Sequence, residues 1–193
     1  KTHLTSFCEN NEKMYLISSK RLAIYNQQNK QVQYEEIPLN YSRLNCMLSL
    51  GKDTIGIGTN NGIILFFAKS KQFRNVEMHF NVMRLFEDSH NELWLFSKEQ
   101  RGIVRYDPLA NEQQHYETPT QNMPKAELRS RDVIFEDSQG TLWVVPHLGC
   151  LSYYDREDKE LKPYYTDYSK PESKFTPVIL NFYVDNQKNF WYA

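Results

Sequence analysis

Paired carboxylates are the first feature of this sequence that could do chemistry. Glu87-Asp88 and Glu136-Asp137 have the composition of the acid pairs that serve as general acid and general base in hydrolases. Both pairs, however, lie in copies of one short motif, whereas a catalytic pair is expected once in a chain. We therefore interpret them as structural parts of a recurring turn.

Other signatures of catalysis or ligand chemistry do not hold up. The five histidines show no pair at zinc-binding spacing, and the three cysteines fit no metal-binding pattern. Segment 56–62, Gly-Ile-Gly-Thr-Asn-Asn-Gly, has one residue too many for a dinucleotide fingerprint and falls on an expected hairpin. We therefore predict no catalytic residues, no metal and no cofactor, and a chain that is not an enzyme.

Composition restricts the partners of this chain. The net charge is -1, with 23 basic and 24 acidic residues, so bulk charge predicts no nucleic-acid partner. The longest apolar run, residues 63–68, is too short to cross a bilayer, so no membrane contact is expected for this region. The 13 Tyr, 11 Phe and 3 Trp favour half-buried strands.

An internal repeat predicts the elements that position these residues. Residues 86–94 read Phe-Glu-Asp-Ser-His-Asn-Glu-Leu-Trp, and residues 135–143 read Phe-Glu-Asp-Ser-Gln-Gly-Thr-Leu-Trp. Later in each copy comes a Gly-x-x-x-Tyr-Asp-like segment, at 102–107 and 149–155. Weaker copies begin at Phe7, Leu48 and Tyr183, which gives a period of roughly 40–50 residues and four short strands per copy. This pattern is typical of β-propeller blades.

Turn chemistry supports this interpretation. Asp88 and Asp137 are expected to accept hydrogen bonds from N–H groups of the turn. Asn91 and Gly140 tolerate the positive φ that such a turn needs, whereas Glu12 and Lys188 occupy the same position and fit it poorly. We therefore expect the first and last turns to differ. The motif tryptophans are expected to pack between blades: Trp94, Trp143 and Trp191.

The predicted fold class is all-β, with blades of four antiparallel strands that form a partial propeller of about four and a half blades. We treat residues 1–193 as one domain from a larger protein, because the sequence starts without Met and stops in an apolar run. The expected blades are residues 1–40, 41–80, 81–117 and 131–166, followed by an incomplete blade at 177–193.

The motif resembles the two-component regulator propeller repeat, most closely at residues 86–107 and 135–155. Such repeats are typical of extracytoplasmic sensors of hybrid two-component histidine kinases in gut Bacteroidetes. The resemblance implies a periplasmic sensor module whose parent protein is anchored in the inner membrane. It also implies an oligosaccharide ligand, signalling to polysaccharide-utilisation genes, and self-association of the parent as a homodimer.

Ligand-binding residues are expected where the repeat is irregular. Loops between the second and third strands, and between successive blades, share one face, and two of these joins are long, at 117–130 and 166–176. Arginine and tyrosine suit polar or anionic sugars through paired hydrogen bonds and stacking. The candidates are Arg84, Lys98, Arg101, Arg129, Arg131, His147, Tyr168 and Lys174.

Two alternatives remain open from the sequence. The first is a propeller enzyme, a lyase or hydrolase acting on polysaccharide, for which His147 with Tyr168 is the one candidate pair. The second is an interaction scaffold in which the blades serve dimerisation. The sequence leaves open the identity of the ligand, the total number of blades and the oligomeric state.

Overall fold

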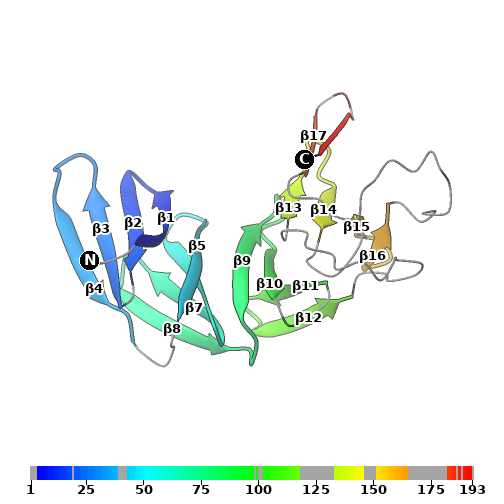
Figure 1. Ribbon diagram of the computed structural model, residues 1–193. Helices are drawn as coiled ribbons and strands as arrows, with labels where there is room; N and C mark the ends of the chain where they lie inside the picture. Colours follow the sequence, from blue (N-terminus) through cyan, green and yellow to red (C-terminus); the bar gives the residue numbers. More distant parts are fainter. Residues whose placement is uncertain are drawn as a thin grey trace. The chain divides into compact units, whose positions relative to one another are not determined.

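The computed structural model describes residues 4–18, 20–38, 43–97, 99, 102–117, 133–145, 151–164, 182–185, 187 and 189–192. All regular elements of these residues are β-strands, and they form four four-stranded antiparallel sheets and one two-stranded sheet (Figure 1). The all-β fold class with blades of four antiparallel strands is confirmed. The described residues contain no helix that could span a membrane.

Two compact units make up the chain: residues 1–85 with 97–99 form unit 1, and residues 86–96 with 100–193 form unit 2. The five sheets fall one by one within the five predicted blade ranges. Their assembly into a single propeller domain over residues 1–193 stays a prediction.

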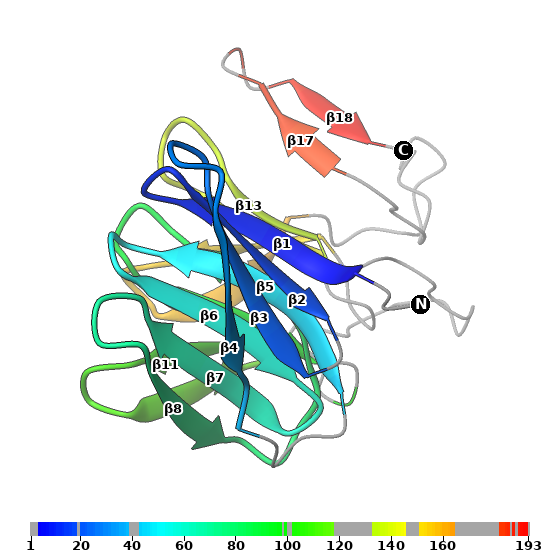
Figure 2. The ribbon, with the colours of Figure 1, turned by 90° about the vertical axis from the view of Figure 1, so that its left-hand side faces the viewer.

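Unit 1 contains two complete sheets, each with its strands in sequence order. The first sheet consists of β1 (Leu4–Asn10), β2 (Lys13–Ser18), β3 (Arg21–Asn26) and β4 (Val32–Glu36). The second consists of β5 (Leu44–Leu50), β6 (Thr54–Thr59), β7 (Gly62–Phe67) and β8 (Gln72–Glu77). Figure 2 shows these two sheets side by side, with β1 next to β5.

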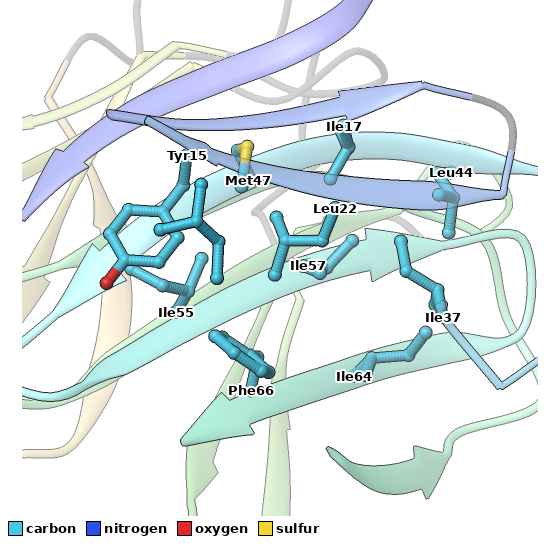
Figure 3. Packing of buried hydrophobic residues seen from close by; sticks show 11 residues of the cluster. Tyr15, Ile17, Leu22, Ile37, Leu44, Met47, Ile55, Ile57, Ile64 and Phe66 are labelled. Carbon is cyan, nitrogen blue, oxygen red and sulfur yellow. The ribbon is translucent and has the colours of Figure 1, made fainter. Parts of the chain in front are cut away.

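Alternation along the strands explains the core between these two sheets. Tyr15 and Ile17 of β2 are buried on one face, and Ile55 and Ile57 of β6 are buried opposite them (Figure 3). The reverse face of the first sheet is more exposed, since Phe7 is 61% and Tyr34 is 65% accessible. Apolar burial of this kind contributes roughly 25 cal/mol per Å² and is the main force holding the two sheets together.

A third sheet has the order β12-β11-β10-β9. Its strands are β9 (Val82–Glu87), β10 (Leu93–Ser97), β11 (Ile103–Asp107) and β12 (Glu112–Tyr116). The division between the units passes through β9 after Leu85. At the start of β11, Gly102 has φ +99°, and a Cβ there would lie 1.9 Å from the carbonyl oxygen of Tyr116, so no other residue fits.

Unit 2 also holds the fourth sheet and the two-stranded sheet. Their strands are β13 (Val133–Glu136), β14 (Leu142–Val145), β15 (Ser152–Asp155), β16 (Glu160–Pro163), β17 (Phe182–Val184) and β18 (Phe190–Tyr192). Trp94 is fully buried among Tyr116, Tyr154 and Val144, and its ring meets that of Tyr154 edge-on at 4.8 Å. Trp143 is buried as well, as predicted, whereas Trp191 is 61% exposed.

Candidate functional site

Antiparallel order gives each sheet two distinct ends. The connections from first to second strand and from third to fourth strand lie at one end, which we call the turn end. The connections from second to third strand and from one sheet to the next lie at the other, which we call the connection end. Chemistry-bearing side chains gather at both ends, and they differ in kind.

At the turn end, one aspartate recurs with the same three hydrogen bonds. Asp88 accepts the backbone N–H groups of His90 and Glu92 with Oδ1, and the indole N–H of Trp94 with Oδ2, each at 2.9 Å. The same bonds are made at two further places: Asp137 with Gln139, Thr141 and Trp143, and Asp185 with Gln187, Asn189 and Trp191. The predicted turn bonds of Asp88 and Asp137 are present, and Asn91 and Gly140 have the expected positive φ.

In unit 2 these turns also join neighbouring sheets through charged groups. Arg156, in the turn after β15, donates to Asp88 Oδ2 at 2.8 Å and to Glu92 Oε2 at 2.7 Å. Arg105 donates to the other oxygen of Glu92. Glu136 on β13 accepts the backbone N–H and the hydroxyl of Ser89. These contacts tie the third sheet to the fourth.

The Asp88 carboxylate is saturated by this arrangement. Its side chain is fully buried, and burial opposes ionisation, but the hydrogen bonds from Arg156 and Trp94 outweigh that effect and lower the pKa of Asp88. A carboxylate held ionised, with donors on both oxygens, is unsuited to taking a proton from a substrate. We conclude that the recurring acid pairs serve the scaffold, in agreement with the interpretation from the sequence.

At the connection end of unit 1 four polar residues form an amide–carboxylate cluster: Asn45, Asn81, Ser97 and Glu99. Asn45, near the start of β5, donates its two amide hydrogens to Asn81 Oδ1 at 2.7 Å and to the Val82 carbonyl at 2.9 Å. Asn81, just before β9, donates its backbone N–H to Glu99 Oε2 at 3.2 Å. Three separate segments therefore meet here.

Glu99 is fixed in place although its side chain is exposed. The Ser97 hydroxyl donates to Glu99 Oε2 at 2.8 Å, and the Glu99 backbone N–H donates back to Ser97 Oγ at 3.1 Å. Slight burial opposes ionisation, but the bonds from Ser97 and Asn81 prevail and lower the pKa of Glu99. The cluster thus presents an oriented, ionised carboxylate to solvent at neutral pH.

The remaining bonding capacity of the cluster consists of acceptors. Both hydrogens of the Asn45 amide are used, while Asn45 Oδ1 has no partner and is shielded from solvent. Across the described part of the chain, no three His, Cys, Asp or Glu side chains are placed to hold a metal ion. Such an arrangement suits a ligand that donates hydrogen bonds.

Seven of the eight predicted ligand residues lie outside the described residues: Lys98, Arg101, Arg129, Arg131, His147, Tyr168 and Lys174. The eighth, Arg84, lies on β9 with an exposed side chain. Its charge also acts on Cys46 of β5, but burial is the larger effect and raises the pKa of that thiol to about 11. Cys46 is therefore a protonated, unreactive thiol at neutral pH.

Sequence reasoning missed the amide–carboxylate cluster. The sequence favoured basic and aromatic residues, mainly in the two long joins, as the ligand contacts. Asn81, however, lies in a short join, and Asn45 lies within a strand. Asparagine and glutamate are common in loops, so composition gave no signal. The available clue was position, because Asn45, Asn81 and Glu99 all flank strand ends at the connection end.

No family model matches the sequence, and no curated protein matches it. Solved structures do resemble the chain. The extracellular domain of a hybrid two-component system from Bacteroides thetaiotaomicron aligns with a TM-score of 0.70 and 17% identity, over 100% of this chain and 26% of that one. Virginiamycin B lyase from Staphylococcus aureus, a catalytically inactive variant with quinupristin, aligns with a TM-score of 0.70 and 14% identity, over 99% and 63%.

A third structure, an auxiliary nutrient binding protein from Bacteroides thetaiotaomicron, aligns with a TM-score of 0.59 and 15% identity, over 83% of this chain and 40% of that one. The chain thus spans about a quarter of the two-component extracellular domain. At these identities a structural likeness establishes the fold alone. The fold implied by the resemblance to the two-component regulator propeller repeat is confirmed: the four-stranded sheets of this chain have a fold similar to part of the extracellular domain of a hybrid two-component system.

Proposed function

We propose that this chain is an extracytoplasmic ligand-sensing module of a hybrid two-component sensor histidine kinase. The repeat motif and the likeness to extracellular domains of such systems support this proposal. The likeness to nutrient-binding proteins supports ligand binding. We further propose that the module lies in the periplasm, with its parent anchored in the inner membrane.

One observation carries the proposal of ligand binding. At the turn end, the motif aspartates of unit 2 are occupied by bonds to backbone, to tryptophan and, for Asp88, to arginine, whereas the cluster at the connection end of unit 1 keeps an oriented carboxylate exposed. Loops on a rigid scaffold are the usual place for binding. The proposed ligand is an oligosaccharide, and the eight residues inferred from the sequence remain its proposed contacts.

Calorimetric titration of the chain with a panel of plant and host oligosaccharides tests this function. Replacing Arg129 and Arg131 together with Ala is expected to weaken binding by roughly 10-fold or more, the loss of charge-assisted hydrogen bonds. Lys69→Ala is the matched control, since Lys69 is exposed at the turn end, where it pairs with Asp53. Absence of binding across the whole panel contradicts the proposal.

The same samples separate the alternatives. Release of shortened or unsaturated sugars during the titration, abolished by His147→Ala, would establish a propeller enzyme in place of a sensor. A change in sedimentation on adding ligand would support the proposed homodimer of the parent. Self-association without any ligand response would favour an interaction scaffold.

A further inference from the structure

The amide–carboxylate cluster constrains the chemistry of any group that binds beside it. Glu99 Oε2 already accepts two hydrogen bonds, from Ser97 and from the Asn81 backbone, and the Asn81 side chain also bonds to this carboxylate. A carboxylate can accept about four hydrogen bonds, so the exposed Glu99 keeps acceptor capacity for a ligand. Asn45 Oδ1 is a second acceptor without a partner. Hydrogen-bond donors of the cluster, by contrast, are engaged with one another or with the Val82 carbonyl.

Orientation makes this carboxylate more than a solvated surface charge. A free glutamate side chain loses rotamer entropy when a ligand immobilises it, which weakens binding. Glu99 has already lost much of that freedom, because Ser97 and Asn81 hold the same carboxylate oxygen from two sides. The Glu99 carboxylate is therefore presented in a defined direction at the connection end.

The unpaired amide oxygen of Asn45 adds to the same bias. Its hydrogen-bonded amide group points both donors toward Asn81 and Val82, so its oxygen leaves a partial negative charge within the cluster. An anionic ligand group would meet this charge and the charge of Glu99 without a nearby donor from the cluster. A hydroxyl or an ammonium group can instead donate to Glu99 at a distance of about 2.6–2.9 Å.

We propose that Asn45, Asn81, Ser97 and Glu99 form a sugar subsite that selects donor groups, the hydroxyls of neutral sugars or the ammonium of amino sugars, over carboxylated or sulfated sugars. The inference rests on the proposed function, because it names the sugar chemistry that the sensor accepts at this place. It also differs from the expectation drawn from the arginines and lysines of the long joins, which suit anionic sugars.

The direction in which Glu99→Gln changes the affinity for each kind of sugar tests the subsite. Glu99→Gln removes the charge but keeps an oxygen that can accept from Ser97 and Asn81, so the fold should be retained, as a thermal melt verifies. The chain and the variant are titrated with maltohexaose, a chitosan hexamer and a galacturonate hexamer. We expect about 10-fold weaker binding of the neutral and amino sugars, and unchanged or tighter binding of the galacturonate.

Two controls fix the interpretation. Glu112→Gln removes a carboxylate from the exposed start of β12 and should change none of the three affinities. Asn45→Leu should weaken neutral sugars in the same direction as Glu99→Gln while leaving the charge of the cluster unchanged. Amide signals of Asn45 and Asn81 in a ¹H–¹⁵N spectrum should shift with the neutral sugar.

The outcomes distinguish this inference from the proposed function. If oligosaccharides bind and the Arg129 and Arg131 substitutions weaken them, but Glu99→Gln has no effect or strengthens neutral sugars, the subsite is wrong and the sensor stands. Weaker binding of the galacturonate by Glu99→Gln, with the neutral and amino sugars unchanged, also overturns the subsite. Failure of all three sugars and the wider panel overturns both.

Discussion

The turns of unit 1 and unit 2 solve the same structural problem with different residues. In unit 2, Asp88 and Asp137 bond to a tryptophan six residues later. In unit 1, the second sheet carries Leu50 and Gly56 at those two positions, and a Cβ on Gly56 would lie 2.9 Å from Leu50 Cδ1. One blade thus fills the space with a polar Asp–Trp pair, and the other fills it with a leucine that packs closely over a glycine.

The first sheet uses a third solution. Its turn is one residue shorter: Cys8 lies opposite Tyr15, whereas Phe135 lies opposite Trp143. Asn11 and Glu12 both have positive φ, at 47° and 60°, as a two-residue hairpin turn requires. The comparison teaches that the same four-stranded sheet accommodates different turn lengths and different residues at the turn, provided that these residues fit one another.

The largest effect that this comparison predicts is on Asp88. Asp88→Ala removes the acceptor of the Trp94 indole N–H and of two turn N–H groups, and leaves Arg156 with Glu92 as its main carboxylate partner, which together should cost about 3–5 kcal/mol of stability. Glu9, which precedes Tyr15 by six residues as Asp88 precedes Trp94, is exposed and its side chain bonds only to Gln27 among the described residues, so Glu9→Ala should cost less than about 1 kcal/mol. Urea unfolding of both variants measures the difference. Equal losses would show that the two turns are equivalent after all.

An intermediate effect is expected at Gly56. Gly56→Ala forces a methyl group against Leu50 Cδ1 and Leu85 Cδ1, at 2.9 and 3.2 Å, and overpacking of this kind costs about 1–3 kcal/mol. Adding Leu50→Ala makes room for the new methyl, so the double variant should lose less than the sum of the two single variants. Thermal or urea unfolding of all four proteins completes the cycle. Additive losses would mean that the two side chains do not compete for space.

The smallest predicted effect is a loss of folding stability at acid pH, and it should occur mainly in unit 2. The hydrogen bond from Trp191 lowers the pKa of Asp185 to about 2, and bonds from Trp143 and the turn amides, which outweigh burial, lower the pKa of Asp137. A group whose folded pKa lies below its unfolded value of about 3.9 stabilises the fold above that pH, and this contribution is lost as pH falls through the folded pKa.

Stability should therefore decrease between roughly pH 5 and pH 2, and Asp137→Asn should flatten that decrease. Among the described residues of unit 1, Glu99 alone has a lowered pKa, so probes in unit 1 should respond less. Hydrogen exchange followed by mass spectrometry at pH 5 and pH 3 reports on both units. Glu157→Gln, at an exposed turn position, serves as the control. Earlier opening of unit 1 on acidification would contradict this assignment.

Much of the fold could be predicted from the sequence, because the repeat encodes it locally. The period places the strands, and aspartate, asparagine and glycine at fixed offsets specify the turns of residues 86–94 and 135–143. The one-residue shift in the first sheet was not predicted. An alignment of Phe7 with Phe135 hides it, since the shortened turn shows itself only in the pairing of Cys8 with Tyr15.

The candidate site was much less predictable. Asn45 lies in the second sheet, whereas Asn81 and Glu99 flank two strands of the third and are 18 residues apart, so only the fold brings the three together. Arg156 illustrates the same limit at the turn end, because nothing local indicates that it reaches Asp88 across 68 residues. Contacts between side chains of different blades cannot be predicted from the sequence of a single repeat.

The Leu50–Gly56 pair has an evolutionary consequence. A blade cannot exchange it for aspartate and tryptophan one residue at a time without passing through a poor intermediate: tryptophan at position 56 would collide with Leu50, and aspartate at position 50 would lack its indole donor. We therefore expect the residues at these two positions to change together when copies of the repeat diverge.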